Sequence, residues 1–197
     1  YLTKSEQAYF YGPTTIIGTD YEIYCEKGFY DTKNKKGYFI KNSQINYNNR
    51  EIKGDSLTFN DLSQFASASR NVKLTDTLNK TIIKGNYAEI FKALDSAMIT
   101  KRSLAIKMVD RDSLYIKADT LFAIGPTENR IIKGRYNVKF YKKNLSGRAD
   151  KIIINQKSGL TKLQRKPLSK REKQILTSKE ISKRNPIIWN GESQMTG

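Results

Sequence analysis

Few side chains in this sequence of 197 residues carry reactive chemistry, but one serine stands in a context typical of a nucleophile. Gly54-Asp55-Ser56-Leu57 has the residue order of a lipase signature in which the serine attacks an ester. Such a serine needs a base to remove its proton, and lipases of this kind use histidine. The chain contains no histidine, and the same position recurs further along it. We therefore interpret these four residues as part of a repeated turn.

The absence of histidine and the single cysteine, Cys25, exclude further kinds of site. Without an imidazole there is no Ser-His-Asp or Cys-His catalytic set, no histidine-ligated metal and no histidine pH switch. One thiol cannot form a disulfide framework or a CxxC redox pair. The chain also has no glycine-rich phosphate loop. We expect a protein that is not an enzyme and needs no cofactor or metal.

Asp110 and Asp112 are the pair of carboxylates that most resembles a ligand set. A calcium loop would need more oxygen ligands close by. A solvated turn is the favoured interpretation of this pair.

The composition is strongly basic but suits a folded chain. Lysine and arginine number 36 against 19 acidic residues, which gives a formal charge of +17. A hydrophobic content of 38%, with 12 tyrosines and 8 phenylalanines, is enough to bury a core. Apolar runs are only three or four residues long, too short to span a bilayer. We expect a soluble chain, and a signal peptide, which is not present in this sequence, would have been removed ahead of Tyr1.

A four-residue module recurs along the chain: an apolar residue, a basic one, a small one, and an acid or amide. Its fourth residues are 31, 33 and 31 positions apart, and the weaker sequence 16–19 precedes the series. Alternating apolar-polar-apolar triplets lie between the modules, separated by turn-forming residues such as Asn48-Asn49 and Asp76-Thr77. The four modules are residues 52–55, 83–86, 116–119 and 147–150, and the triplets are 45–47, 72–74, 106–108 and 138–140.

This pattern predicts an all-β fold of stacked antiparallel strands. Residues 88–98 are an exception, because Ile90, Leu94 and Met98 have helical spacing. The repeat instead predicts a strand over 87–92, a turn at 94–96 and a new strand over 97–100. We favour the repeat.

Two sets of residues recur in step with the repeat. Basic residues at matching positions would form columns of like charge on neighbouring strands, either a solvated outer face or a contact for a partner that carries phosphates. Apolar residues alternate with them and could form one inner face, either an ordinary core or a groove for acyl chains. The basic set is Lys53, Lys84, Lys117 and Arg148 with Lys73, Lys107 and Lys139, and the apolar set is Leu57, Phe59, Leu74, Ile90, Met108, Leu121, Phe140 and Ile154.

The chain changes character after residue 163. From Lys162 to Arg184 it has nine lysines and arginines against two glutamates. We divide the chain into a β-repeat domain (1–163), a basic linker or short helix (164–184) and the strand-like start of a further repeat (185–197). A solvated segment is the favoured interpretation of 164–184, and contact with an anionic surface is the other. The ending after Ile187-Ile188-Trp189 predicts a fragment of a longer protein.

Several stretches together resemble the OstA-like family of lipopolysaccharide-transport proteins (LptA-type). They are residues 83–91, 94–100, 112–121 and 130–134, together with Asp150 and the sequence 185–191. The resemblance implies a periplasmic β-jelly-roll (β-taco) that holds lipopolysaccharide, or its lipid A part, with acyl chains inside and phosphates on a basic rim. It also implies partners of the same fold, joined by edge-strand pairing. The family offers no catalytic residues, and the high charge and the segment 164–184 depart from its compact members.

Two other functions remain open. A structural β-stack, acting as a scaffold or assembly segment, would have a filled interior. A polyanion-binding module, for example for nucleic acid, would carry tyrosines interleaved with lysines on one exposed face. Because Tyr21, Tyr24, Tyr38 and Tyr47 lie in strand-like runs, we do not expect nucleic acid as a partner.

Overall fold

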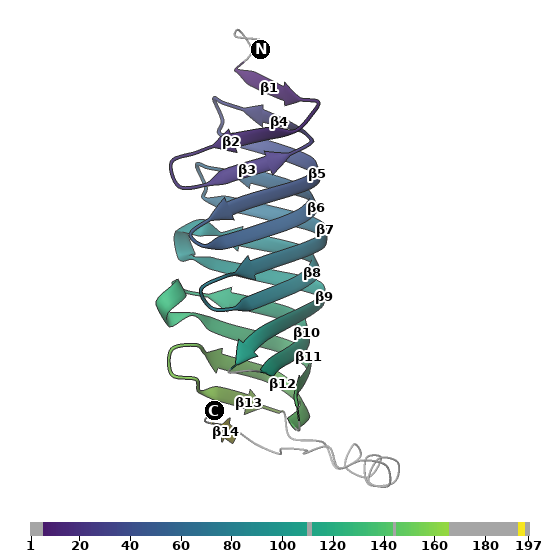
Figure 1. Cartoon of the computed structure of the whole chain (residues 1–197), viewed down its shortest axis with the longest axis vertical. Coiled ribbons are helices and arrows are strands. Elements are labelled where there is room, and N and C mark those ends of the chain that lie inside the picture. The colour runs from purple at the N-terminus through teal and green to yellow at the C-terminus, as the bar shows by residue number, and fades with distance from the viewer. Residues whose placement is uncertain (1–5, 110–111, 144, 166–192, 196–197) are drawn as a thin grey trace.

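A computed structural model describes residues 6–109, 112–143, 145–165 and 193–195. These residues form one 14-stranded antiparallel sheet with two short 3₁₀ turns, which confirms the predicted all-β class (Figure 1). The strands follow chain order from β4 to β14, β1 pairs with β4, and β2 and β3 join through β5. The elements are β1 (Gln7–Phe10), β2 (Thr14–Ile17), β3 (Glu22–Cys25), β4 (Lys27–Asp31), β5 (Lys36–Tyr47), β6 (Arg50–Asn60), β7 (Phe65–Asp76), β8 (Thr81–Phe91), η1 (Lys92–Leu94), β9 (Ser96–Val109), β10 (Asp112–Ile124), η2 (Thr127–Asn129), β11 (Ile131–Lys142), β12 (Leu145–Asn155), β13 (Thr161–Gln164) and β14 (Ser193–Met195).

Each long strand from β5 to β12 is interrupted at its middle. In β5, β7, β9 and β11 two successive residues have positive φ there. The pairing of β7, β9 and β11 with both neighbours shifts at that point, and β5 shifts against β6 and changes partner from β4 to β3. Such a bulge adds a residue to one strand and bends it. The four pairs are Lys41-Asn42, Arg70-Asn71, Lys101-Arg102 and Tyr136-Asn137.

The repeated module occupies β6, β8, β10 and β12 opposite these bulges. Its small third residue, such as Gly85, is buried where the strands bend. A Cβ on Gly85 would lie 2.5 Å from Ile99 Cγ2 and 2.8 Å from the carbonyl oxygen of Thr100, so no larger residue fits. The module is therefore the inner side of a corner within a strand. Our prediction of a turn at Gly54-Asp55-Ser56-Leu57 was wrong, because these residues continue β6.

The fourth residue of the module accepts a hydrogen bond on the outer surface of the corner in two of the four repeats. Asn71 Nδ2 donates to both carboxylate oxygens of Asp55 at 3.1 Å, and Asn137 Nδ2 donates to Asp119 Oδ2 at 2.6 Å. Asparagine adopts positive φ more readily than most residues, since its short polar side chain can hydrogen-bond locally. The acid or amide of the repeat thus pairs with the bulge of the next strand.

The corners fold the sheet into two walls. Wall A contains residues 43–47, 50–53, 72–76, 81–84, 103–109, 112–117, 138–142 and 145–148, and β2 and β3 extend it. Wall B contains the other half of each long strand, extended by β1, β4 and β13. Figure 1 shows the turns of both walls on the same side of the molecule, opposite the bends. We call the line along which these two sets of turns meet the mouth.

The structure also decides the ambiguous stretch 88–98. Residues up to Phe91 belong to β8, η1 covers Lys92–Leu94, and β9 starts at Ser96, as the repeat predicts. The helical spacing of Ile90, Leu94 and Met98 does not produce an α-helix, because cross-strand pairing satisfies this backbone. No helix among the described residues is long and apolar enough to cross a membrane.

The predicted C-terminal segments lie mostly beyond the described residues. Neither the basic stretch from 166 to 184 nor Ile187-Ile188-Trp189 falls within them. Of the last predicted segment, Ser193–Met195 forms β14 and pairs with β13.

Candidate functional site: the apolar interior and its mouth

Seven of the eight apolar residues predicted for the inner face lie in the interior between the walls. They are no more than 6% exposed and belong to one continuous hydrophobic core. The alternation of the strands puts every second side chain on this inner face. The seven are Leu57, Phe59, Leu74, Ile90, Leu121, Phe140 and Ile154.

Met108 was wrongly assigned to the interior, because its side chain is 53% exposed. The reason is a register error of three residues in β9. Lys84 pairs with Leu104, so the β9 triplet that matches Val72-Lys73-Leu74 is Ser103-Leu104-Ala105. Three residues further on, in Ile106-Lys107-Met108, the two outer members of the triplet point outward and the middle one points inward. Lys107 therefore lies on the inner side, opposite buried Thr81 and partly buried Leu114. Burial lowers the pKa of the Lys107 ammonium.

The other six predicted basic residues lie on the outer surface of wall A. Lys53 faces Lys73, Lys73 faces Lys84, Lys117 faces Lys139, and Lys139 faces Arg148 on successive strands. The two predicted columns thus form one row, with Leu104 between Lys84 and Lys117. Because wall A separates this row from the interior, these six residues do not form a rim around it.

Buried ion pairs connect the two walls at the mouth. Arg50 begins β6 in wall A, and its Nη2 lies 2.6 Å from Oδ1 of Asp95, which follows η1 in wall B. Arg130 lies at the start of wall B's β11, 3.5 Å from Asp95 and 3.9 Å from Asp76 of wall A. The side chains of Arg50 and Arg130 are 0% and 1% exposed. The guanidinium of Arg50 also donates to Tyr47 Oη at 3.0 Å, and burial raises the pKa of this phenol.

Weaker polar contacts extend this closure along the mouth. Lys92 Nζ lies 2.5 Å from Asp20 Oδ1, and Tyr21 Oη donates to Asp61 Oδ2 at 3.5 Å. Burial, with Tyr30 and Asp61 nearby, raises the pKa of Tyr21, so the hydroxyl keeps the proton that it donates.

Towards the other end of the molecule, side-chain amides bridge the walls. Asn79 Nδ2 donates to the carbonyl oxygen of Thr127 at 3.3 Å, and Gln156 Nε2 donates to Thr81 Oγ1 at 3.2 Å. Together with the ion pairs of Arg50, Arg130 and Lys92 and the Tyr21 hydrogen bond, we call these contacts the polar seam.

The interior is packed next to Phe59 and Ile90. A cavity inside it, next to Phe59 and Ile90, has a volume of about 10 Å³. This is room for about one water molecule and far too little for an acyl chain. Any long apolar ligand would therefore have to separate the walls.

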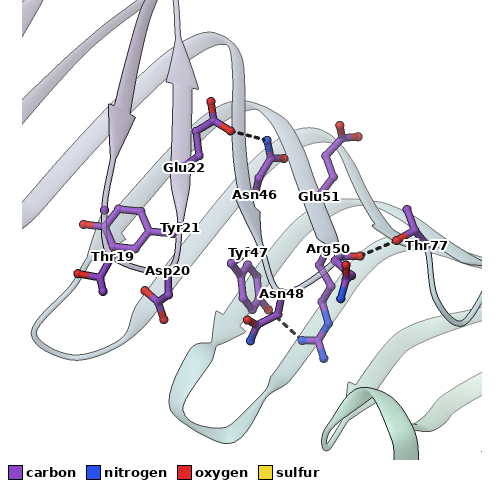
Figure 2. Close-up of a pocket in the computed structure, with 12 residues that line it drawn as sticks. Thr19, Asp20, Tyr21, Glu22, Asn46, Tyr47, Asn48, Arg50, Glu51 and Thr77 are labelled. Carbon is purple, nitrogen blue, oxygen red and sulfur yellow. Dashed lines mark hydrogen bonds between the residues drawn. The ribbon is translucent and has the colours of Figure 1, made fainter.

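A larger hollow of about 480 Å³ lies on the outside of the mouth (Figure 2). It is lined by residues 18–22 and 46–51 and by Thr77, which include none of the predicted contact residues. Asp20, Glu22 and Glu51 carry carboxylates here, and Asn46 donates to Glu22 at 3.4 Å (Figure 2). These acids make the hollow unsuitable for a phosphate group.

The described residues contain no group of acids and cysteine that could hold a metal ion. Cys25 is free and fully buried, and burial raises the pKa of its thiol. Asp112 begins β10, and its Oδ1 accepts a hydrogen bond from the amide of Ser113 at 2.7 Å, while Asp110 lies outside the described residues. The arrangement is suited to burying apolar groups.

The single folded sheet with an apolar interior defines a β-jelly-roll. A solved structure with a similar fold is the crystal structure of LptH from Pseudomonas aeruginosa, described as the LptA-homologous periplasmic component of a lipopolysaccharide transport device. The TM-score is 0.53 with 14% sequence identity over 74% of this chain and 93% of LptH. No family model and no curated protein sequence matches the chain. The similarity at this identity concerns the fold.

Sequence reasoning missed the seam residues, although a weak pattern was available. Arg50 and Asp76 stand at strand ends, and Asp95 and Arg130 directly precede β9 and β11. Charged residues at strand ends are normally solvated, so nothing in the sequence marks them as buried. Only the pairing of distant turns across the mouth brings them together.

Proposed function

We propose that this chain is a non-enzymatic module that carries lipopolysaccharide, or its lipid A part, in the periplasm. The observation that carries the proposal is the continuous apolar interior of a folded sheet whose two walls are held together along the mouth by polar contacts only. The similarity to the fold of LptH and the OstA-like sequence features support it. Leu57, Phe59, Leu74, Ile90, Leu121, Phe140 and Ile154 would contact the acyl chains.

Entry of a chain requires the polar seam to part. Burying one methylene group contributes about 0.8 kcal/mol, so a chain of a dozen methylenes contributes on the order of 10 kcal/mol. Breaking a buried ion pair costs about 3–5 kcal/mol, and an exposed one costs less than about 1 kcal/mol. A single acyl chain therefore supplies enough free energy to offset opening part of the seam.

Lys107 is the best placed of the seven predicted cations to meet a phosphate of a lipid held inside. It faces inward near the mouth end of wall A, and its partly buried ammonium would gain a counter-ion there. A phosphate contact would reverse the effect of burial on its pKa.

Neighbouring jelly-roll modules are the expected protein partners, joined through edge strands. Among the described strands, β2 pairs only with β3, and β1 pairs only with β4. Ile17 of β2 is 82% exposed, as is Tyr11 between these two strands. Unpaired backbone groups of such an edge can accept a further strand.

A structural scaffold is a second candidate, because the interior next to Phe59 and Ile90 is packed. In that function the apolar residues would be a permanent core and the seam would never open. The two functions differ in whether a lipid can be retained.

Native mass spectrometry of the protein incubated with lipid A separates the two functions. The carrier function predicts a retained complex of one lipid per chain at low salt. Phe140→Asp, which puts a charge in the interior, should abolish the complex if the variant remains folded by circular dichroism. Tyr38→Asp on the outer face of wall B is the matched control. Failure of the unaltered protein to retain lipid A at low salt would favour the scaffold.

A further inference from the structure

The outer face of wall A carries a row of cations that crosses seven strands. We define the basic row as Lys53, Lys73, Lys84, Lys117, Lys139 and Arg148, one on each strand from β6 to β12 except β9, where Leu104 takes the place. Neighbouring strands are about 4.8 Å apart. The row therefore places like charges directly opposite one another, which destabilises a sheet.

Few acids neutralise this row within the part of the chain that the structure describes. Lys53 Nζ lies 3.1 Å from Glu51, and it is the one member with a carboxylate within ion-pair distance there. The C-terminal segment from 166 to 184 is itself strongly basic, and so is a second copy of the chain at +17. A bound partner that offsets the row would therefore be an anionic molecule of another kind.

An apolar row runs beside the basic row on the same outer face. Ile82 faces Ile106, Ile106 faces Tyr115, and Tyr115 faces Tyr141. Each lies two positions along its strand from the basic row, or from Leu104 in β9, and so about 7 Å away. Tyr115 and Tyr141 are 41% and 53% exposed, and Met108 next to them is 53% exposed. In a sheet with one face in water, polar side chains normally point to the water and apolar side chains to the core. Apolar side chains on the outer face of wall A are therefore unusual.

We propose that the outer face of wall A docks onto the surface of an anionic lipid bilayer. The basic row would pair with lipid phosphates, and the apolar row would enter the interface, where tyrosine is favoured because its ring is apolar and its hydroxyl polar. Aliphatic Ile82, Leu104 and Ile106 favour a bilayer over nucleic acid, because they offer no ring for bases to stack on. This docking goes beyond the proposed carrier function and does not require any lipid in the interior.

Vesicle binding tests the docking. The full chain is sedimented with vesicles of phosphatidylglycerol and phosphatidylcholine mixed in equal parts, and with vesicles of phosphatidylcholine alone. We expect binding to the anionic vesicles only, weakened at least tenfold between 0.05 and 0.5 M NaCl as screening increases (about 13 Å against about 4 Å Debye length). Inorganic phosphate at equal ionic strength should not compete, because it lacks an apolar surface.

Charge reversal locates the surface. The triple variant Lys84→Glu, Lys117→Glu, Lys139→Glu should weaken vesicle binding more than a hundredfold. It should still fold, because it turns two of the four like-charge pairs of the row, 73/84 and 139/148, into pairs of opposite charge. The matched control reverses three exposed lysines of wall B and its turns, Lys27, Lys36 and Lys157, and should weaken binding less than tenfold.

Tryptophan fluorescence tests insertion of the apolar row. In a background with the single tryptophan changed, Trp189→Phe, the variant Tyr115→Trp should shift to shorter wavelength with anionic vesicles and be quenched by brominated lipids. Tyr38→Trp on wall B should show neither change.

Three results would overturn the docking: no binding to anionic vesicles at low salt, equal losses in the two triple variants, or tighter binding of a single-stranded oligonucleotide than of vesicles. The last result would identify a nucleic-acid interface instead. Retention of lipid A in the interior is measured separately, so failure of the carrier function and failure of the docking are distinguishable.

Discussion

The side chain of Arg130 is 1% exposed, and it joins both walls through Asp76 and Asp95. We predict that Arg130→Met lowers the free energy of unfolding by about 3–5 kcal/mol, because it leaves the buried carboxylate of Asp76 without its cation. Urea denaturation measures this difference. Lys33→Met is the control, since the pair of Lys33 with Glu6 is exposed and should contribute less than about 1 kcal/mol. A loss below about 1 kcal/mol for Arg130→Met would mean that the seam does not hold the walls together.

Lys107 should make stability depend on pH. Burial lowers its pKa in the folded state, so between this pKa and the ordinary value near 10.4 the unfolded state binds more protons. Stability should therefore rise with pH through this window on account of this group. Lys107→Met should be more stable than the unaltered protein at pH 7, and the difference should shrink as pH approaches 10.5. Thermal unfolding at several pH values measures it, and a constant difference would contradict the inward placement.

At the scale of the strands, each corner combines positive φ at the bulge with pairing to the neighbouring strand. Asn71 shows both, because it has φ 50° and donates to Asp55. Asn71→Ala should cost about 1–2 kcal/mol, because alanine is strained at φ 50° and Asp55 loses its donor. Asn71→Gly should cost less, since glycine adopts this φ without strain. Urea denaturation of the two variants checks the order. Equal costs would mean that only the hydrogen bond matters.

The sequence predicts the strands well and their facing less well. The alternation in Val72-Lys73-Leu74 and Val138-Lys139-Phe140 is enough to assign Leu74 and Phe140 to the interior. In β9 the same alternation in Ile106-Lys107-Met108 is shifted by three residues, so both Lys107 and Met108 were placed on the wrong face. Where the outer face also carries apolar residues, the alternation of apolar and polar residues does not show which of them point inward. The seam could not be predicted, because it depends on turns that are distant in the sequence.

At the scale of the whole molecule, the excess of positive charge should make stability rise with salt. Screening relieves repulsion along the exposed basic row, whereas the ion pairs of Arg50 and Arg130 are buried and less screened. We predict that the melting temperature rises by about 2–4 °C for each kcal/mol of repulsion removed between 0.05 and 0.5 M NaCl. The control is the variant Lys84→Gln, Lys117→Gln, which should melt higher at low salt and respond less. A melting temperature that falls with salt would contradict this balance.

Photo-crosslinking tests most directly whether the interior takes up acyl chains. Benzoylphenylalanine is placed at Phe140 in the interior and, as control, at Tyr38 on the outer face of wall B. Each variant is irradiated with lipid A below the concentration at which the lipid aggregates. We expect a covalent lipid adduct at position 140 and none at position 38. No adduct at position 140, from a variant that is folded, would contradict this expectation and leave the interior as a permanent core.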